Sequence, residues 1–307
     1  MPRLREHRDD LRALVGITAE ARGIGSVFIE KDFWVTEVLR AATAPITIVA
    51  RDGSHHGVRT IFKGGTSLSR IYGVIERFSE DVDLLIGFPP VDASTGAKDH
   101  VLKSIRDSVT AHLGIGEANA VADGLATKGV KRNTRYHYTP LGYEHSGELT
   151  SGVLLEMGCR GGTFPTQTRP LRSMVAEHAI EVLGEDIDAW DEFAEFDVEV
   201  LGPTRTLLEK LSLLHDAVSR SSDDGGEGRL MRSGRHLYDV HNLLRDDNVL
   251  EGLRAAGQAG VADLCADIEQ HSSDAGFSYT PRPTGGYGQH PFAVLDRIDA
   301  EIDLAAG

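Results

Sequence analysis

In the first half of the chain, some segments have apolar residues at helical spacing and others have short apolar runs typical of strands. Apolar positions three to four residues apart predict helices, and short apolar runs bounded by turn residues predict buried strands. Helical spacing covers residues 3–22, 29–40 and 98–113, whereas short apolar runs cover residues 84–86 and 152–158. Because helices and strands are mixed in this way, the pattern predicts an α/β (α+β) fold.

The second half of the chain has helical spacing almost throughout. Pro203, followed by Thr204 and Thr206, is a typical helix start, and apolar residues recur from there to residue 218. Further helical patterns begin at residue 235 and continue beyond residue 250. An acidic stretch at about 184–202 separates the halves, which predicts two domains, residues 1–200 and residues 201–307.

Two carboxylates stand at the start of the apolar run 84–86. Side chains two residues apart on a strand point the same way, so Asp81 and Asp83 would share one face. Carboxylates this close repel each other unless a cation or a proton lies between them. Mg²⁺ is usually held by one or two carboxylates and completed by substrate phosphates. Taken alone, an Asp-x-Asp pair is more often a pair of solvated acids.

A glycine-rich turn precedes these carboxylates. Gly64-Gly65-Thr66-Ser67 is followed by 13 residues, 68 to 80, and then by Asp81-Val82-Asp83. Glycines allow the backbone to approach a ligand closely, and hydroxyl and N–H groups at a helix start suit an anionic phosphate. A Gly-Gly pair is otherwise often only a turn.

The order of these two motifs resembles the nucleotidyltransferase superfamily of the DNA polymerase β type. The fuller strings FKGGTSL and RFSEDVDLL resemble the AbiEii-type nucleotidyltransferase toxins, which include the MenT-like group. Three more stretches resemble the same family: EKDFWVTEVL, PTRTLLEKLSLLHDA and RHLYDVHNLL. The resemblance covers residues 29–245. It implies a nucleotidyltransferase core with a short mixed sheet, followed by a helical domain that closes the active-site cleft.

The resemblance also implies roles for individual residues. Asp81 and Asp83 would be catalytic and would hold Mg²⁺ on an NTP, and the nucleotide would be bound by Lys63, Gly64, Gly65, Thr66, Ser67 and Arg205. Lys210 and Asp239 match the active-site lysine and the aspartate of the closing motif. From the residues alone, Lys210 would extend from an apolar stripe to water, and Asp239 would pair with Arg235 one helical turn away.

Glu156 is the one charged residue in the apolar run 152–158. A carboxylate buried alone is costly, so Glu156 needs a partner. It is our candidate for the third metal carboxylate that the superfamily takes from a neighbouring strand. A salt bridge to Arg160 or Arg172 is the alternative, because structural ion pairs resemble functional sites.

Charge is distributed unevenly along the 307 residues, whose formal net charge is −15. That charge argues against a protein that coats nucleic acid non-specifically. Residues 124–143, however, contain no Asp or Glu and hold tyrosines among four basic residues, Lys128, Lys131, Arg132 and Arg135. This basic strip is a candidate RNA contact, or else the solvated edge of a β-hairpin.

The helix predicted at 29–40 carries two adjacent charges, Lys31 and Asp32. Such residues are mostly exposed, so both are predicted to be surface charges. The family resemblance indicates only that this helix borders the active cleft.

These observations predict a toxin of a toxin–antitoxin system that transfers NMP from an NTP to an RNA acceptor, first of all the tRNA 3′ end. Mg²⁺ would be the cofactor and a cognate antitoxin the protein partner. No apolar run reaches the ~20 residues of a membrane span and the first residues do not form a signal peptide, so we expect a cytoplasmic protein. The alternatives are a small-molecule or protein acceptor, or a non-catalytic nucleotide-binding protein.

Overall fold

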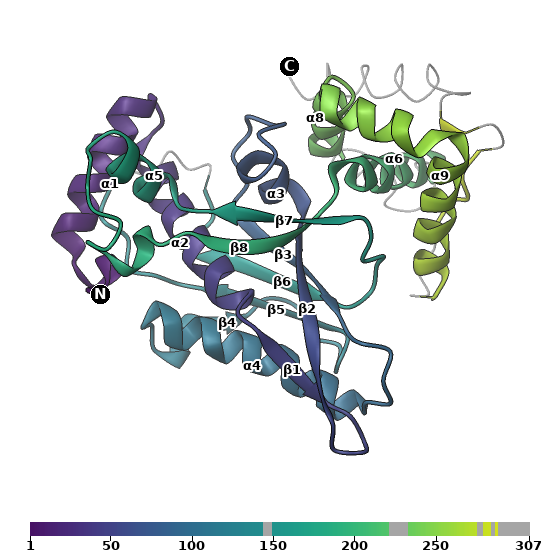
Figure 1. The fold of residues 1–307 in the computed structure, drawn as a ribbon, viewed down its shortest axis with the longest axis horizontal. Coiled ribbons are helices and arrows are strands. Elements are labelled where there is room, and N and C mark those ends of the chain that lie inside the picture. The colour runs from purple at the N-terminus through teal and green to yellow at the C-terminus, as the bar shows by residue number, and fades with distance from the viewer. Residues whose placement is uncertain (144–148, 221–232, 275–278, 284–285, 288–307) are drawn as a thin grey trace. The chain divides into compact units, whose positions relative to one another are not determined.

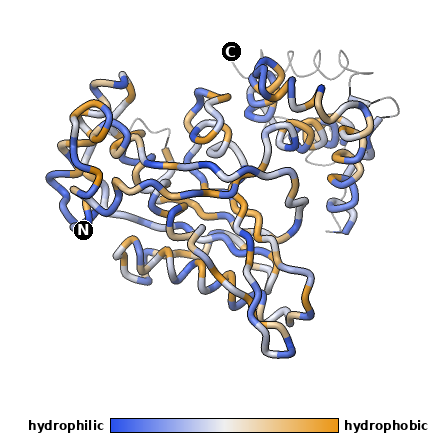
Figure 2. Tube along the Cα trace, in the orientation of Figure 1, coloured by the Kyte–Doolittle hydropathy of each residue, from blue (hydrophilic) through white to orange (hydrophobic). Residues whose placement is uncertain are grey.

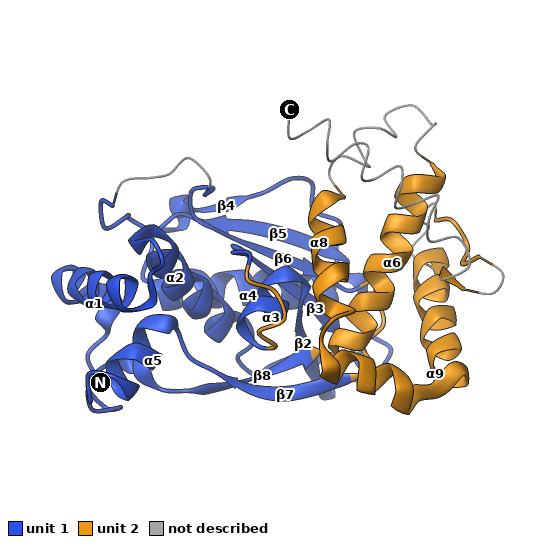
Figure 3. Ribbon diagram, turned by 90° about the horizontal axis from the view of Figure 1, so that it is seen from above, with its two compact units in different colours: residues 1–71, 77–159, 166–200 blue, residues 72–76, 160–165, 201–307 orange. Residues whose placement is uncertain are grey.

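The computed structural model describes residues 1–143, 149–220, 233–274, 279–283 and 286–287. The chain forms two compact units (Figure 3). The first consists of Met1–Ile71, Arg77–Cys159 and Thr166–Val200. The second consists of Tyr72–Glu76, Arg160–Pro165 and Leu201–Gly307, within which several stretches of the predicted helical domain lie outside the described residues.

A mixed β-sheet is the centre of the first unit (Figure 1). Its strand order is β4-β5-β6-β3-β2-β8-β7, with β1 paired to β2. The strands are β1 (Ile46–Val49), β2 (His55–Lys63), β3 (Asp81–Gly87), β4 (Ala120–Ala122), β5 (Lys131–Tyr136), β6 (Val153–Gly158), β7 (Thr166–Leu171) and β8 (Phe196–Leu201). β3 is parallel to β6 and antiparallel to β2, whereas β2 is parallel to β8. The predicted α/β fold with a mixed sheet is confirmed.

Helices pack on this sheet and on one another, and they supply much of the core. They are α1 (Arg8–Arg22), α2 (Ser26–Ala42), α3 (Gly64–Arg70), α4 (Thr95–Leu113) and α5 (Met174–Glu181), with the short 3₁₀ helices η1 (Leu4–Glu6), η2 (Glu117–Asn119) and η3 (Asp191–Phe193). Hydrophobic residues concentrate along the central strands (Figure 2), where β3 buries Val82, Leu84, Leu85 and Ile86. The amphipathic α4 covers one sheet face. Its Arg106 carbonyl accepts a hydrogen bond from the hydroxyl of Tyr136 on β5.

The acidic stretch 184–202 does not act as a simple connection between halves. Its last part forms β8, which pairs with β2 at Ile61 and Phe62. Strand residues Val198 and Val200 are buried, and these alternate with the acidic Asp197 and Glu199. The acidic residues led to the interpretation of this stretch as a connection, although β8 has one apolar face.

The second unit is helical in its described part. It contains α6 (Pro203–Ser219), α8 (Gly234–Leu243) and α9 (Asp247–Asp274), and α9 is interrupted by non-helical backbone at Gly257. α6 begins with Pro203 at its first position, as the sequence predicts. Leu208, Cys265 and Ile268 form a small apolar core between α6 and α9. In the described residues, no helix has the length and apolar character that crossing a bilayer requires.

Candidate active site

A row of four polar side chains crosses the sheet of the first unit. Lys63 of β2 lies opposite Asp83 of β3, Asp83 lies beside Glu156 of β6, and Glu156 lies opposite Asn133 of β5. Residues in register on neighbouring strands share a sheet face, and Asp81 shares it because it precedes Asp83 by two positions. The structure thus brings together Lys63 and the three predicted carboxylates. We call these residues and Asn133 the carboxylate row.

Negative charge is concentrated in this row. Burial, together with the nearby carboxylates of Glu156 and Asp81, raises the pKa of Asp83 to about 7 against the lowering effect of Lys63. The pKa of Asp81 is raised as well, first by burial and then by the carboxylates of Glu80 and Glu156. Because nearby carboxylates disfavour each other's charged forms, a cation among them would stabilise this site.

The donor set fits a hard divalent cation held in part by substrate. Among the described residues, no three His, Cys, Asp or Glu side chains form a complete metal-binding group. Mg²⁺ does not need one, since it usually takes one or two carboxylates and fills its other positions with water and phosphate oxygens. Asp83 and Glu156, which share a hydrogen bond, form such a two-carboxylate pair.

Glu156 has a partner that the sequence analysis did not identify. Its Oε1 accepts a hydrogen bond of 2.6 Å from Nδ2 of Asn133. Arg172, one of the two arginines considered as its partner, lies instead 3.6 Å from Glu195. Glu156 is therefore held by an amide and by its neighbouring carboxylate, which leaves its charge available to a ligand.

The glycine-rich turn is built against the Asp83 carboxylate. Gly64 has φ +79°, a conformation that L side chains rarely adopt, and a Cβ there would overlap Oδ2 of Asp83. Only glycine therefore allows α3 to begin so close to the carboxylate row.

The hydroxyl groups of the turn are already engaged. Thr66 Oγ1 lies 2.5 Å from the carbonyl oxygen of Asp81, and Ser67 Oγ lies 2.9 Å from that of Gly64. Both residues are buried. The Thr66 hydroxyl thus joins the turn to β3, and the Ser67 hydroxyl makes a hydrogen bond within the turn, so together they fix the backbone around the carboxylates.

The prediction that Lys31 and Asp32 are surface charges is wrong, because both are buried in α2. Lys31 Nζ lies 2.9 Å from Glu80, next to Asp81, and donates a hydrogen bond to the carbonyl of Thr150. Burial lowers the pKa of Lys31 although Glu80 opposes that effect. Each charge tolerates burial because another element supplies a partner.

Asp32 connects α2 to two further helices. Its Oδ1 lies 2.6 Å from Arg70 Nε at the end of α3, and its Oδ2 accepts a hydrogen bond from the backbone of Met174 at the start of α5. Two residues of α2 thus fix the site: Asp32 holds the end of α3, and Lys31 holds Glu80 at the start of β3. Sequence alone could not show this, since none of these partners is near α2 in the chain.

The basic strip is divided between the two sheet faces. Lys131 and Arg135 lie on the face of the carboxylate row, because each is two positions from Asn133 along β5. Arg132 lies on the opposite face, where it pairs with Asp99 of α4 at 3.2 Å. Lys128 is exposed and precedes the strand. The four residues therefore do not form one continuous patch.

In the second unit, Lys210 and Asp239 form a buried ion pair between α6 and α8. Lys210 Nζ lies 2.8 Å from Asp239 Oδ2, and it lies 3.4 Å from Nδ1 of His236. Lys210 is 7% exposed and Asp239 is 0% exposed, so the lysine does not extend to water. The two residues that match the family's motifs are in direct contact.

Arg205 has three partners within its own unit. Its guanidinium lies 2.6 Å from Asp267 and 2.9 Å from Glu209, and it donates to the carbonyl of Phe164 at 2.7 Å. With 1% of its surface exposed, Arg205 holds α6 to α9 and to residue 164. Its predicted role as a phosphate ligand would require these contacts to open.

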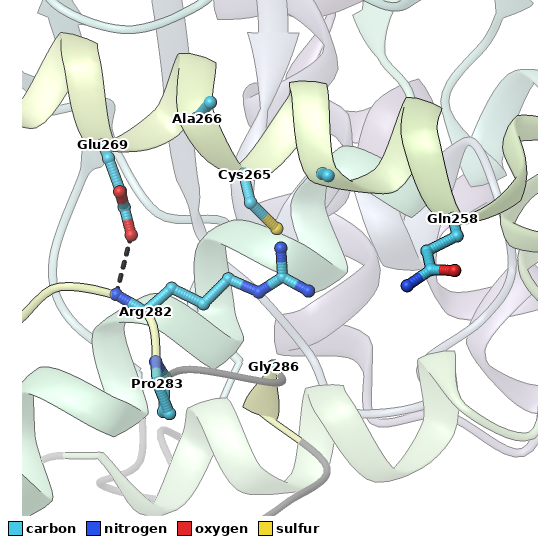
Figure 4. Close-up of a pocket in the computed structure, with 8 residues that line it drawn as sticks. Gln258, Cys265, Ala266, Glu269, Arg282, Pro283 and Gly286 are labelled. Carbon is cyan, nitrogen blue, oxygen red and sulfur yellow. Dashed lines mark hydrogen bonds between the residues drawn. The ribbon is translucent and has the colours of Figure 1, made fainter.

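A separate cavity of about 380 Å³ lies along α9 (Figure 4). Arg282 extends across it beside Cys265, and its backbone N–H donates to Glu269 at 2.7 Å. Neither Lys210 nor Asp239 lines this cavity. It is therefore distinct from the ion pair between α6 and α8.

Comparison with protein families gives a match that covers both groups of residues. The family model described as nucleotidyl transferase AbiEii toxin, type IV TA system, matches residues 48–291. That range contains the carboxylate row, the glycine-rich turn and the Lys210–Asp239 pair, whereas Lys31 and Asp32 precede it. The chain matches no curated protein sequence. Since the family model covers most of the chain, this protein belongs to the AbiEii family of nucleotidyl transferase toxins of type IV toxin–antitoxin systems.

Proposed function

We propose that this protein is a Mg²⁺-dependent nucleotidyltransferase that transfers NMP from an NTP to an RNA acceptor, the tRNA 3′ end. The observation that carries the proposal is the Asp83–Glu156 pair, in register on neighbouring strands beside Lys63 and Asp81. Its charge suits a cation that arrives with a triphosphate. Blocked tRNA 3′ ends would stop translation, which is the expected effect of a toxin.

The reaction would be an in-line displacement at the α-phosphorus. A hydroxyl oxygen of the acceptor forms the new P–O bond, the bond to pyrophosphate breaks, and the hydroxyl proton passes to a carboxylate. When bound, Mg²⁺ would neutralise phosphate charge and align the leaving group. Asp81, Asp83 and Glu156 would hold the cation.

The remaining residues would bind and orient the reactants. Lys63 and the turn of residues 64–67 would contact the triphosphate, for which a lysine is a suitable point charge. Lys210 would neutralise charge on the α-phosphate or on pyrophosphate, and its partner Asp239 would orient it. The attacking hydroxyl would give its proton to Glu156 or to Asp239.

The RNA acceptor is supported by the charges beside the row. Lys131 and Arg135 lie on the carboxylate face of a chain whose net charge is −15, so they could attract an RNA end locally. A small-molecule or protein acceptor would depend less on these residues. An antitoxin partner follows from the family.

The test is transfer of label from each α-³²P NTP to total tRNA in the presence of Mg²⁺. Wild-type protein should label tRNA with its preferred NTP, and the Asp81→Ala, Asp83→Ala double variant should not. Asp92→Asn is a matched control, because Asp92 is exposed and pairs with Arg51, outside the carboxylate row and the basic strip. Toxicity on expression without labelled tRNA would indicate another acceptor. Equal labelling by wild type and the double variant would contradict the proposed site.

A further inference from the structure

Asn133 is the residue of the carboxylate row that neither a sequence motif nor the composition of the chain indicates as a site residue. It occupies the centre of β5, between Lys131 and Arg135, and faces Glu156 in register. It is 9% exposed, and its Nδ2 donates to Glu156 at 2.6 Å. The side-chain amide of Asn133 is therefore positioned by a carboxylate on the neighbouring strand β6.

The amide oxygen of Asn133 is the unusual part of this contact. Oδ1 is fully buried and has no hydrogen-bond partner among the residues that the structure describes. Buried polar atoms nearly always have a partner, because the loss of water is otherwise not compensated. An unpartnered amide oxygen beside a row of carboxylates therefore indicates a ligand that such an oxygen can contact, a hydrogen-bond donor or a cation.

The geometry points to Asn133 as a ligand of the divalent cation and as a positioning residue for Glu156. We infer that Nδ2 orients the Glu156 carboxylate while Oδ1 offers a neutral oxygen to the cation that Asp83 and Glu156 hold. Carbonyl and carboxylate oxygens are the donors that Mg²⁺ and Mn²⁺ prefer. A neutral donor adds coordination without further repulsion in a row that already contains three carboxylates.

This inference rests on the proposed metal role of Asp83 and Glu156, so the experiment tests both with Mn²⁺ alone, in the absence of nucleotide. Calorimetry gives the Mn²⁺ dissociation constant, and a melting curve gives the rise in Tm that Mn²⁺ produces. Asn133→Ala should weaken Mn²⁺ binding by about tenfold and reduce the rise in Tm. Asn133→Asp should restore Mn²⁺ binding while it lowers the Tm of the metal-free protein, because a fourth carboxylate then joins the row.

Thr134→Val is the matched control, since Thr134 is buried next to Asn133 but points to the opposite sheet face. It should change Tm without changing the Mn²⁺ dissociation constant. Asp83→Asn separates the two ideas. If Asp83→Asn abolishes Mn²⁺ binding and Asn133→Ala leaves it unchanged, the inference on Asn133 is overturned and the proposed metal site stands. If Mn²⁺ binding does not depend on Asp83, both are overturned.

Discussion

At the residue scale, the site depends on how closely the backbone of the glycine-rich turn approaches a carboxylate. A side chain at residue 64 would overlap Asp83 and would need φ +79°. Gly64→Ala should therefore abolish nucleotide transfer and destabilise the fold by roughly 1–2 kcal/mol for the left-handed backbone alone. Transfer rates and urea unfolding curves would measure the two effects.

Gly65→Ala is the comparison for this prediction. Gly65 has ordinary backbone, and a Cβ there would come within 2.7 Å of Arg77 Nη2 and 2.9 Å of Ser79 Oγ, which are ends of flexible side chains. These can move, so Gly65→Ala should cost much less activity than Gly64→Ala. Equal losses would mean that the approach to Asp83 is not what requires glycine.

The raised pKa of Asp83 predicts how stability depends on pH. Its pKa is about 7 in the folded protein, compared with 3.8 for a free side chain. Between these values the folded state holds a proton that the unfolded state has lost, so this group stabilises the fold below about pH 4 and the contribution is lost as pH rises through 7. The effect is at most a few kcal/mol, on the order of 1.4 kcal/mol per pKa unit.

Asp83→Asn removes this titration. Relative to wild type, the variant should gain stability between pH 5 and pH 8, as measured by urea unfolding in EDTA. Mg²⁺ favours the ionised carboxylate, so its addition should stabilise wild type more at pH 8 than at pH 5 and should affect the variant less. Parallel pH profiles for the two proteins would contradict the assignment.

At the scale of elements, α2 organises the site through buried charges. Lys31 is within 2.9 Å of Glu80 and binds the carbonyls of Thr150 and Gly152, so one side chain fixes the start of β3 and the approach to β6. Lys31→Met should lower the free energy of unfolding by about 3 kcal/mol, because it leaves a partly buried carboxylate without its partner.

A double-mutant cycle with Glu80→Gln tests whether the pair is the cause. The double variant should be destabilised by about 1–3 kcal/mol less than the sum of the single variants. Additive effects would show that Lys31 acts through the two carbonyls or through packing alone.

Elements with a local signal could be predicted from sequence, and elements that depend on distant partners could not. Asp81, Asp83 and Glu156 stand in short apolar runs, and Gly64 stands in a recognisable turn, so the two strands, the turn and the face shared by Asp81 and Asp83 were predicted. The place of Glu156 beside them was expected only from the family resemblance. The burial of Lys31 and Asp32 and the contact of Asn133 with Glu156 depend on residues far away in the chain. β8 was missed because its exposed face is acidic.

At the scale of the whole molecule, the proposed RNA acceptor would have to bind a chain with a net charge of −15 through a small basic surface. Lys131 and Arg135 lie on the carboxylate face, whereas Arg132 lies on the opposite face and pairs with Asp99. Lys131→Gln and Arg135→Gln should each weaken tRNA binding. Each phosphate contact that is lost should reduce the salt slope, log K against log salt, by about 0.7 for single-stranded RNA.

Arg132→Gln is the matched control, since it removes the same charge from the same strand. It should leave tRNA affinity and its salt slope unchanged and should lower only stability, because Asp99 loses one of its partners. Arg135 should contribute less than Lys131, since Asp123 already lies 2.9 Å from its guanidinium and must be released before a phosphate can bind. If all three variants change the slope equally, total charge rather than the face of the sheet determines binding. If none does while transfer to another acceptor persists, the RNA acceptor is wrong and the chemistry of the carboxylate row serves a different hydroxyl.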